Sequence, residues 1–128
     1  MPQFKYEEIT KKIIGAAMKV HSALGPGLLE SAYETCLVHE VGQRGLNVRR
    51  QVVLPLIYDG IKLDAGYRQD LLINEQVIVE LKSVEKFLPI HTAQLLSYLK
   101  LSSLKLRYLL NFNVVHMRDG IKRIVNGI

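Results

Sequence analysis

The sequence predicts a single α/β domain over residues 1–128, with the element order α-α-β-β-β-α-β-β. Two observations predict this class. Apolar residues recur at helical spacing before residue 45 and at every second position after residue 48. Pro89 suits the first turn of a further helix, which separates three strands from two. A chain of 128 residues is long enough to bury one substantial hydrophobic core.

The first third of the chain is expected to form two helices. Over residues 6–24 the apolar positions follow a helical stripe, and the lysines fall mostly outside it. Gly25-Pro26-Gly27 then breaks the helix. A second helix is expected from Leu28, and Gly45 is a suitable residue for its C-terminal cap.

Three strands are expected next, over residues 48–58, 61–73 and 77–83. Asp59-Gly60 joins the first two as a two-residue hairpin signal, and Ala65-Gly66 is expected to bend the second strand.

The remaining elements are a helix and two strands. The helix begins at Pro89 and carries His91, Gln94 and Tyr98, the last two of which share a face. Strands follow over 104–113 and over about 120–125, with a turn at Asp119-Gly120 between them.

Composition limits the function classes. A single cysteine, Cys36, excludes a disulfide framework and a cysteine metal site within one chain. No signal peptide and no apolar run of membrane-spanning length is seen, so a cytoplasmic protein without a membrane partner is expected. The net charge of +5 suits a polyanionic partner, although many proteins share such a surplus.

An unusual feature is the charged end of the strand 77–83, Glu80-Leu81-Lys82, which follows the apolar run Val77-Ile78-Val79. Asp70 lies on the preceding strand, and the loop length decides whether it faces Glu80. A two-residue loop places Asp70 opposite Val79, whereas a three-residue loop, Asn74-Glu75-Gln76, places it opposite Glu80.

With the three-residue loop, Asp70, Glu80 and Lys82 share one face of the sheet, because side chains alternate along a strand. The opposite face would be wholly apolar; it would carry Leu71, Ile73, Val77, Val79 and Leu81. Facing carboxylates repel each other unless positive charge lies between them, and Mg²⁺ prefers such hard oxygen ligands. The alternative interpretation is a solvated salt bridge, which is common at strand ends.

The ordered set of Asp70, Glu80-Leu81-Lys82 and Gln94-x-x-x-Tyr98 resembles the PD-(D/E)xK nuclease superfamily, in particular its RecB-like branch. Upstream, Gly27-Leu28-Leu29-Glu30-Ser31-Ala32-Tyr33 is similar to the signature of the small bacterial GxxExxY proteins, which are usually placed in that superfamily. Gln69 stands where the family has a proline before the aspartate.

This resemblance implies a restriction-endonuclease-like core, a mixed sheet of about five strands flanked by helices. It also implies hydrolysis of nucleic-acid phosphodiester bonds with Mg²⁺ or Mn²⁺. Asp70 and Glu80 would hold the metal, and Lys82 would position the attacking water or stabilise developing charge. Glu30 and Gln94 would complete the catalytic site. The expected substrate contacts are Tyr98, His91, Arg49, Arg50, Lys100 and Arg107.

The basic residues among these contacts are expected to form a track for phosphates beside the site. DNA is favoured over RNA as the partner, and the oligomeric state stays open, a homodimer included. Two alternatives remain: a non-catalytic nucleic-acid-binding module on the same fold, and a structural or regulatory partner protein whose charged cluster is only a salt-bridge network.

Overall fold

The computed structural model describes residues 2–53, 56–63, 68–85, 88–90, 93 and 106–125, and the statements below concern these residues. Two helices lead the chain, α1 (Pro2–Leu24) and α2 (Glu30–Gln43), joined through the glycine-rich break that the sequence predicts. Gly45 follows α2 with φ +80°, a conformation that glycine adopts without steric cost, so its predicted capping role is confirmed. None of the described helices is long and apolar enough to cross a membrane.

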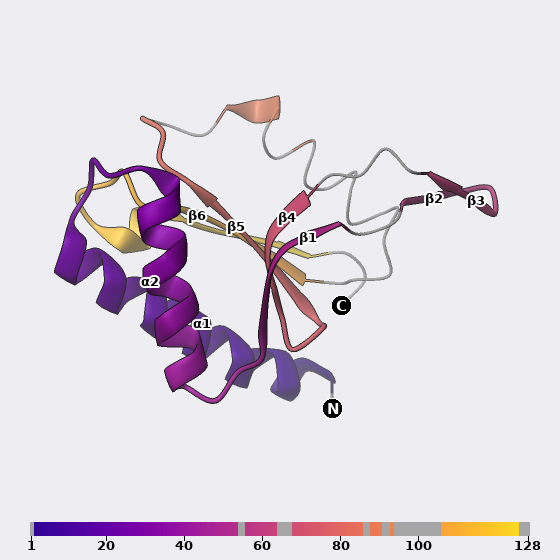
Figure 1. The fold of residues 1–128 in the computed structure, drawn as a ribbon, viewed down its shortest axis with the longest axis horizontal. Helices are drawn as coiled ribbons and strands as arrows, with labels where there is room; N and C mark the ends of the chain where they lie inside the picture. Colours follow the sequence, from indigo (N-terminus) through magenta and orange to yellow (C-terminus); the bar gives the residue numbers. More distant parts are fainter. Residues whose placement is uncertain are drawn as a thin grey trace.

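A mixed five-stranded sheet forms the centre of the molecule. Only the pair β5 and β6 is parallel; the other neighbours are antiparallel. The strands, in spatial order, are β1 (Val48–Val53), β4 (Arg68–Ile73), β5 (Val77–Lys82), β6 (Leu106–Asn111) and β7 (Ile121–Val125). Figure 1 shows this sheet with both helices against one of its faces. The α/β class with a five-stranded mixed sheet is therefore confirmed.

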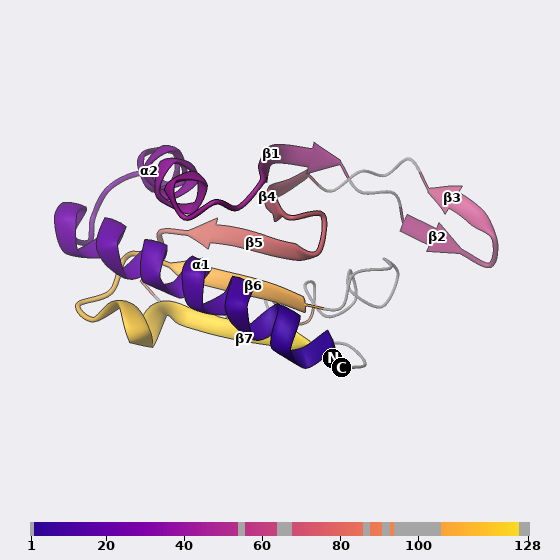
Figure 2. The ribbon, with the colours of Figure 1, turned by 90° about the horizontal axis from the view of Figure 1, so that it is seen from below.

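The two predicted strands at 48–58 and 61–73 are each divided, which corrects the expected order. Residues 48–53 and 68–73 join the main sheet, but β2 (Leu56–Tyr58) and β3 (Ile61–Leu63) form a separate hairpin. This hairpin extends beyond the ends of β1 and β4 (Figures 1 and 2). Its turn is the predicted Asp59-Gly60, in which both residues have positive φ.

A parallel pair such as β5 and β6 requires a long crossover connection between its strands. The helix predicted from Pro89 falls in this connection, and residues 89, 90 and 93 are helical. The rest of that predicted helix lies outside the described residues. The expected turn at Asp119-Gly120 is instead part of a short 3₁₀ helix, η1 (Met117–Gly120), which precedes β7.

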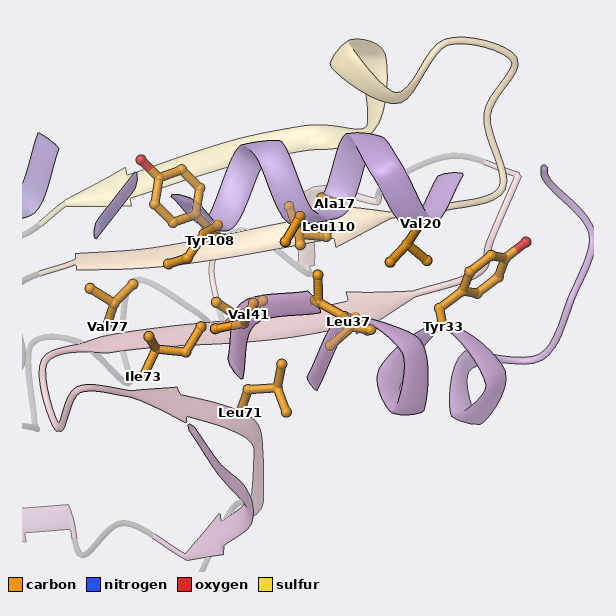
Figure 3. Packing of buried hydrophobic residues seen from close by; sticks show 14 of the residues in the cluster. Ala17, Val20, Tyr33, Leu37, Val41, Leu71, Ile73, Val77, Tyr108 and Leu110 are labelled. Atoms are coloured by element: carbon orange, nitrogen blue, oxygen red, sulfur yellow. The ribbon is translucent and has the colours of Figure 1, made fainter. Parts of the chain in front are cut away.

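The hydrophobic core lies between the two helices and one face of the sheet. Figure 3 shows Ala17 of α1 and Leu37 of α2 directed towards strand side chains such as Leu71 and Leu110. The face that alternation assigns to the core is confirmed, since its residues all belong to this cluster: Leu71, Ile73, Val77, Val79 and Leu81. The charged residues of β4 and β5 consequently lie on the other face of the sheet.

Candidate active site

The turn between β4 and β5 fixes how the two charged strand ends meet. Asn74 and Glu75 adopt φ values of 50° and 56°, and the Gln76 N–H donates to the Ile73 carbonyl at 3.0 Å. Leu71 therefore pairs with Val79, and Ile73 pairs with Val77. This is the register of the three-residue loop, so the two-residue alternative is wrong. Continuing that register by one residue brings Asp70 opposite Glu80.

Two crossed hydrogen bonds hold the carboxyl groups at this position. The Asp70 N–H donates to Oε1 of Glu80 at 3.2 Å, and the Leu81 N–H donates to Oδ2 of Asp70 at 2.8 Å. Each carboxyl group thus accepts a main-chain hydrogen bond from the opposite strand. The predicted convergence of Asp70 and Glu80 is confirmed by these contacts.

Burial and like charge raise the pKa of both carboxyl groups. Removal from water is the larger cause at Glu80, and the charge of Asp70 adds to it, so that the pKa of Glu80 is raised to about 7. Burial also raises the pKa of Asp70. The hydrogen bond from the Leu81 N–H lowers this pKa, and the negative charge of Glu34 raises it further. The pair therefore favours either a retained proton or additional positive charge.

Two cations lie beside this pair, and they differ in exposure. Arg107 of β6 is 2% exposed and its Nη2 lies 3.2 Å from Oε1 of Glu80. Lys82, the last residue of β5, is half-buried, and its charge lowers the pKa of both carboxyl groups. It forms no ion pair with a carboxylate among the residues described. The Lys82 ammonium is therefore available to another negative group.

Glu30 reaches the same end of β5 from the first turn of α2. Its Oε1 accepts from the Ser83 N–H at 3.3 Å, and the Ser83 hydroxyl donates to the Leu28 carbonyl at 2.8 Å. These two bonds fasten the start of α2 to the residue that follows Lys82. The structure thus brings Glu30, Asp70, Glu80 and Lys82 to one end of the β4–β5 pair.

Two residues around the site were not singled out from the sequence. Glu34, one turn after Glu30 on α2, is 8% exposed and accepts from Arg50 at 2.7 Å. The Gln51 side-chain amide donates to Oε1 of Glu34 at 2.8 Å and, at 3.5 Å, to Oδ1 of Asp70. A second acidic residue four positions after Glu30 was a signal for Glu34, since both lie on one helical face. Nothing in the sequence distinguishes Gln51.

The expected phosphate track is only partly consistent with the geometry. Arg49 is half-exposed and paired with Glu75 at 3.2 Å, and Arg50 is half-exposed and paired with Glu34. Arg107 was expected on the surface, but it is buried because the strand face that carries it is covered, and its guanidinium contacts Glu80. We therefore assign Arg107 to holding Glu80 and not to phosphate. The other expected residues lie outside the described part of the chain: His91, Gln94, Tyr98 and Lys100.

The donor set at Asp70 and Glu80 fits a small divalent cation. Both groups offer hard oxygens. Among the described residues, Oδ2 of Asp70 accepts a short hydrogen bond from the Leu81 N–H, and Oε1 of Glu80 accepts from the Asp70 N–H and from Arg107. Within the described ranges, no three His, Cys, Asp or Glu side chains gather as a metal-binding cluster. Such a cation would accordingly have two protein carboxylates and complete its coordination with water or substrate, as Mg²⁺ commonly does.

The fold and the paired carboxylates define an α/β domain of the nuclease type. The family model of the PD-(D/E)XK nuclease superfamily matches residues 7–124, nearly the whole chain. The chain therefore belongs to the PD-(D/E)XK nuclease superfamily. Neither the curated proteins nor the solved structures gave a significant match. Membership supports a nuclease-like function on nucleic acid, and nucleases of this superfamily generally use divalent metal ions.

Proposed function

We propose that this chain is a Mg²⁺- or Mn²⁺-dependent nuclease that hydrolyses phosphodiester bonds, with DNA as the preferred substrate. The observation that carries the proposal is the crossed pair of hydrogen bonds that sets Asp70 beside Glu80, next to Lys82 on the same strand face. A structural salt bridge needs one carboxylate here; a second buried one raises the cost of the fold. Buried like charges that lower the stability of the fold are typical of a functional site.

In this proposal Asp70 and Glu80 hold the cation, which supplies positive charge to a phosphate oxygen when bound. Arg107 holds Glu80 in place from the neighbouring strand β6, at 3.2 Å. Lys82 stabilises the negative charge that develops on the reacting phosphate, because its ammonium has no carboxylate partner among the described residues. Glu30 lies close enough to the strand end to orient a water molecule or the substrate.

We assign Gln94 a site-orienting role, and His91, Tyr98 and Lys100 substrate contacts, from the sequence alone. Arg49 and Arg50 are half-exposed, and an approaching phosphate could draw either from its present carboxylate partner. We also propose that residues 1–128 act as one nuclease-like domain. The PD-(D/E)XK match over residues 7–124 supports that extent.

We also propose that the chain belongs to the GxxExxY subgroup of this superfamily. The structural roles of the signature residues support this assignment. Gly27 has φ +97°, which strongly favours glycine. Glu30 contacts Ser83, and the Tyr33 hydroxyl donates to the Gly25 carbonyl at 2.6 Å. The three signature positions therefore fix the path of the chain from α1 to the end of β5.

The test is single-turnover cleavage of DNA and RNA with Mg²⁺ or Mn²⁺, beside a binding assay in Ca²⁺. Lys82→Ala should reduce cleavage by about 10²-fold or more, by analogy with the loss of one stabilising donor. Nucleic-acid affinity should change far less, since a charge that acts on the transition state contributes little to ground-state binding. Lys12→Ala on α1, which removes a lysine from the helical layer, is the matched control and should change neither value.

If the wild-type chain cleaves no form of DNA or RNA, the proposed nuclease activity is rejected. Binding retained without metal would then favour the non-catalytic module. A partner protein with a purely structural charge network would bind no nucleic acid at all.

A further inference from the structure

The strand β1 contains a backbone distortion beside the candidate site. Gln51 has φ +50°, a left-handed conformation that is costly for residues other than glycine. Among the described non-glycine residues with positive φ, the other three lie in turns: Asp59, Asn74 and Glu75. Gln51 is the member of this group that lies within a strand. Strain of this kind persists only where the surrounding structure enforces it, and it often accompanies function.

The distortion removes Gln51 and Asp70 from the β1–β4 ladder. Arg50 pairs with Leu71 and Val52 pairs with Gln69, in one register, yet the positions between them are not paired. No residue is inserted, so this is a local rotation of the backbone and not a bulge with a shifted register. The Gln51 side chain lies between α2 and β4, where its amide contacts Glu34 and Asp70.

Glu34 determines which end of the Gln51 amide faces the site. Its carboxylate is held by Arg50 at 2.7 Å, and an ionised carboxylate only accepts hydrogen bonds. The Gln51 NH₂ group must therefore point to Oε1 of Glu34, at 2.8 Å. The same nitrogen then presents its second hydrogen to Oδ1 of Asp70, at the long distance of 3.5 Å. Hydrogen bonds within active sites are often long in ligand-free proteins and tighten on binding.

We infer that Gln51 is a positioning residue, which restrains Oδ1 of Asp70 so that this carboxylate is ready to bind a divalent cation; the inference rests on the proposed function. The Leu81 N–H already holds Oδ2 of Asp70 at 2.8 Å, so the amide of Gln51 restrains the other oxygen. The carboxylate is thereby held in one orientation from two strands. Partners that orient metal ligands in this way typically change metal affinity or activity by about 10- to 100-fold.

The test is Gln51→Gly, because glycine removes the amide and also relieves the strained backbone. Metal affinity should then fall without a loss of stability. The melting temperature should be unchanged or higher, whereas Mn²⁺ affinity, measured by calorimetric titration, should fall about 10-fold or more. With saturating Mg²⁺, kcat should fall by a similar factor and KM should change little.

Two further variants sharpen this result. Asp59→Gly relieves the same kind of backbone strain at the tip of the β2–β3 hairpin, and it should leave Mn²⁺ affinity unchanged. Gln51→Glu keeps the length of the side chain but replaces the donor by a third carboxylate beside Glu34 and Asp70. It should therefore weaken cleavage more than the glycine variant does.

The inference is overturned if Gln51→Gly binds Mn²⁺ as the wild type does, or if it loses stability while its metal affinity is retained. Both results would assign Gln51 a structural role only. A wild-type chain that binds Mn²⁺ but cleaves no nucleic acid would reject the proposed function alone. In that case the Mn²⁺ affinity of the glycine variant still decides the role of Gln51.

Discussion

Replacing Asp70 by asparagine should make the metal-free protein more stable at pH 8 and insensitive to Mg²⁺. Asparagine keeps an oxygen for the Leu81 N–H, which now donates to Oδ2 of Asp70 at 2.8 Å. It removes the charge that, together with burial, raises the pKa of Glu80 from 4.5 to about 7. The substitution thus relieves like-charge repulsion without removing a packing contact.

The sign of the pH dependence follows from that pKa. Between about pH 4.5 and 7 the folded protein retains the Glu80 proton, whereas the unfolded chain has lost it. The free energy of unfolding therefore falls as the pH rises through this window and is constant above it. At about 1.4 kcal/mol per pKa unit, the total loss from Glu80 is about 3 kcal/mol.

Burial contributes more to this shift than the charge of Asp70, so the asparagine variant should recover about 1 kcal/mol at pH 8. For a domain of this size, that corresponds to a rise in melting temperature of about 3–5 °C. The gain should be smaller at pH 5, where Glu80 is protonated in the folded protein. With Mg²⁺ at one hundred times its Kd the wild type should gain about 2.7 kcal/mol, and the variant should gain little.

The assay is a series of thermal melts at pH 5 and 8, with EDTA and with Mg²⁺. Glu7→Gln, which neutralises an exposed carboxylate on α1, is the control and should follow the wild type. A drop of several degrees for Asp70→Asn at pH 8 without metal would refute the reasoning. Asp70 would then be a structural anchor, and the partner-protein alternative would gain support.

Two further predictions concern residues that hold the site in place. Arg107→Met should lower the free energy of unfolding by about 3 kcal/mol in urea at pH 8, because it leaves the buried Glu80 unpaired. The loss should be smaller at pH 5, and an equal loss at both pH values would indicate that Arg107 contributes packing alone. Tyr33→Phe should cost about 1–2 kcal/mol, since the Gly25 carbonyl and the Leu28 N–H lose the hydroxyl group. Its kcat should equal that of the wild type, and a loss of activity without a loss of stability would instead make Tyr33 catalytic.

The arrangement of Asp70, Glu80 and Lys82 could be predicted from the sequence because side-chain alternation in a strand is regular. Once the apolar residues Leu71, Val79 and Leu81 are assigned to the core, the charged residues must lie on the opposite face. Only the loop length stayed open, and the left-handed conformations at the turn decided it. The same alternation could not show that residues 56–63 form a separate hairpin, since such a hairpin repeats the pattern of a continuous strand. The expected bend at Ala65-Gly66 lies outside the described residues.

The burial of Arg107 was not predictable from its own position. Alternation indicates that Arg107 faces away from the helices, and such a face is ordinarily exposed to solvent. Leu72 and Ile78 on the same face are nevertheless 2% and 0% exposed, so both faces of the central strands are covered. A single sequence reports the period of a strand but not how many of its faces are buried. The sequence therefore could not show that Arg107, which was expected among the phosphate contacts, is buried.

The distribution of fixed charges bears on the proposed role of an additional cation at this site. In the metal-free protein Arg50 is paired with Glu34 at 2.7 Å, and Arg107 is paired with Glu80 at 3.2 Å. Even with Arg107 in contact, the pKa of Glu80 is about 7, so the paired carboxyl groups still lack positive charge near neutral pH. Filling that deficit with one more buried arginine would stabilise the fold but would occupy the oxygens that a mobile cation needs. Under the proposed function, this shortage of positive charge is the property that would let the metal-free protein bind a cation, and Arg107 would keep Glu80 in place until the cation binds.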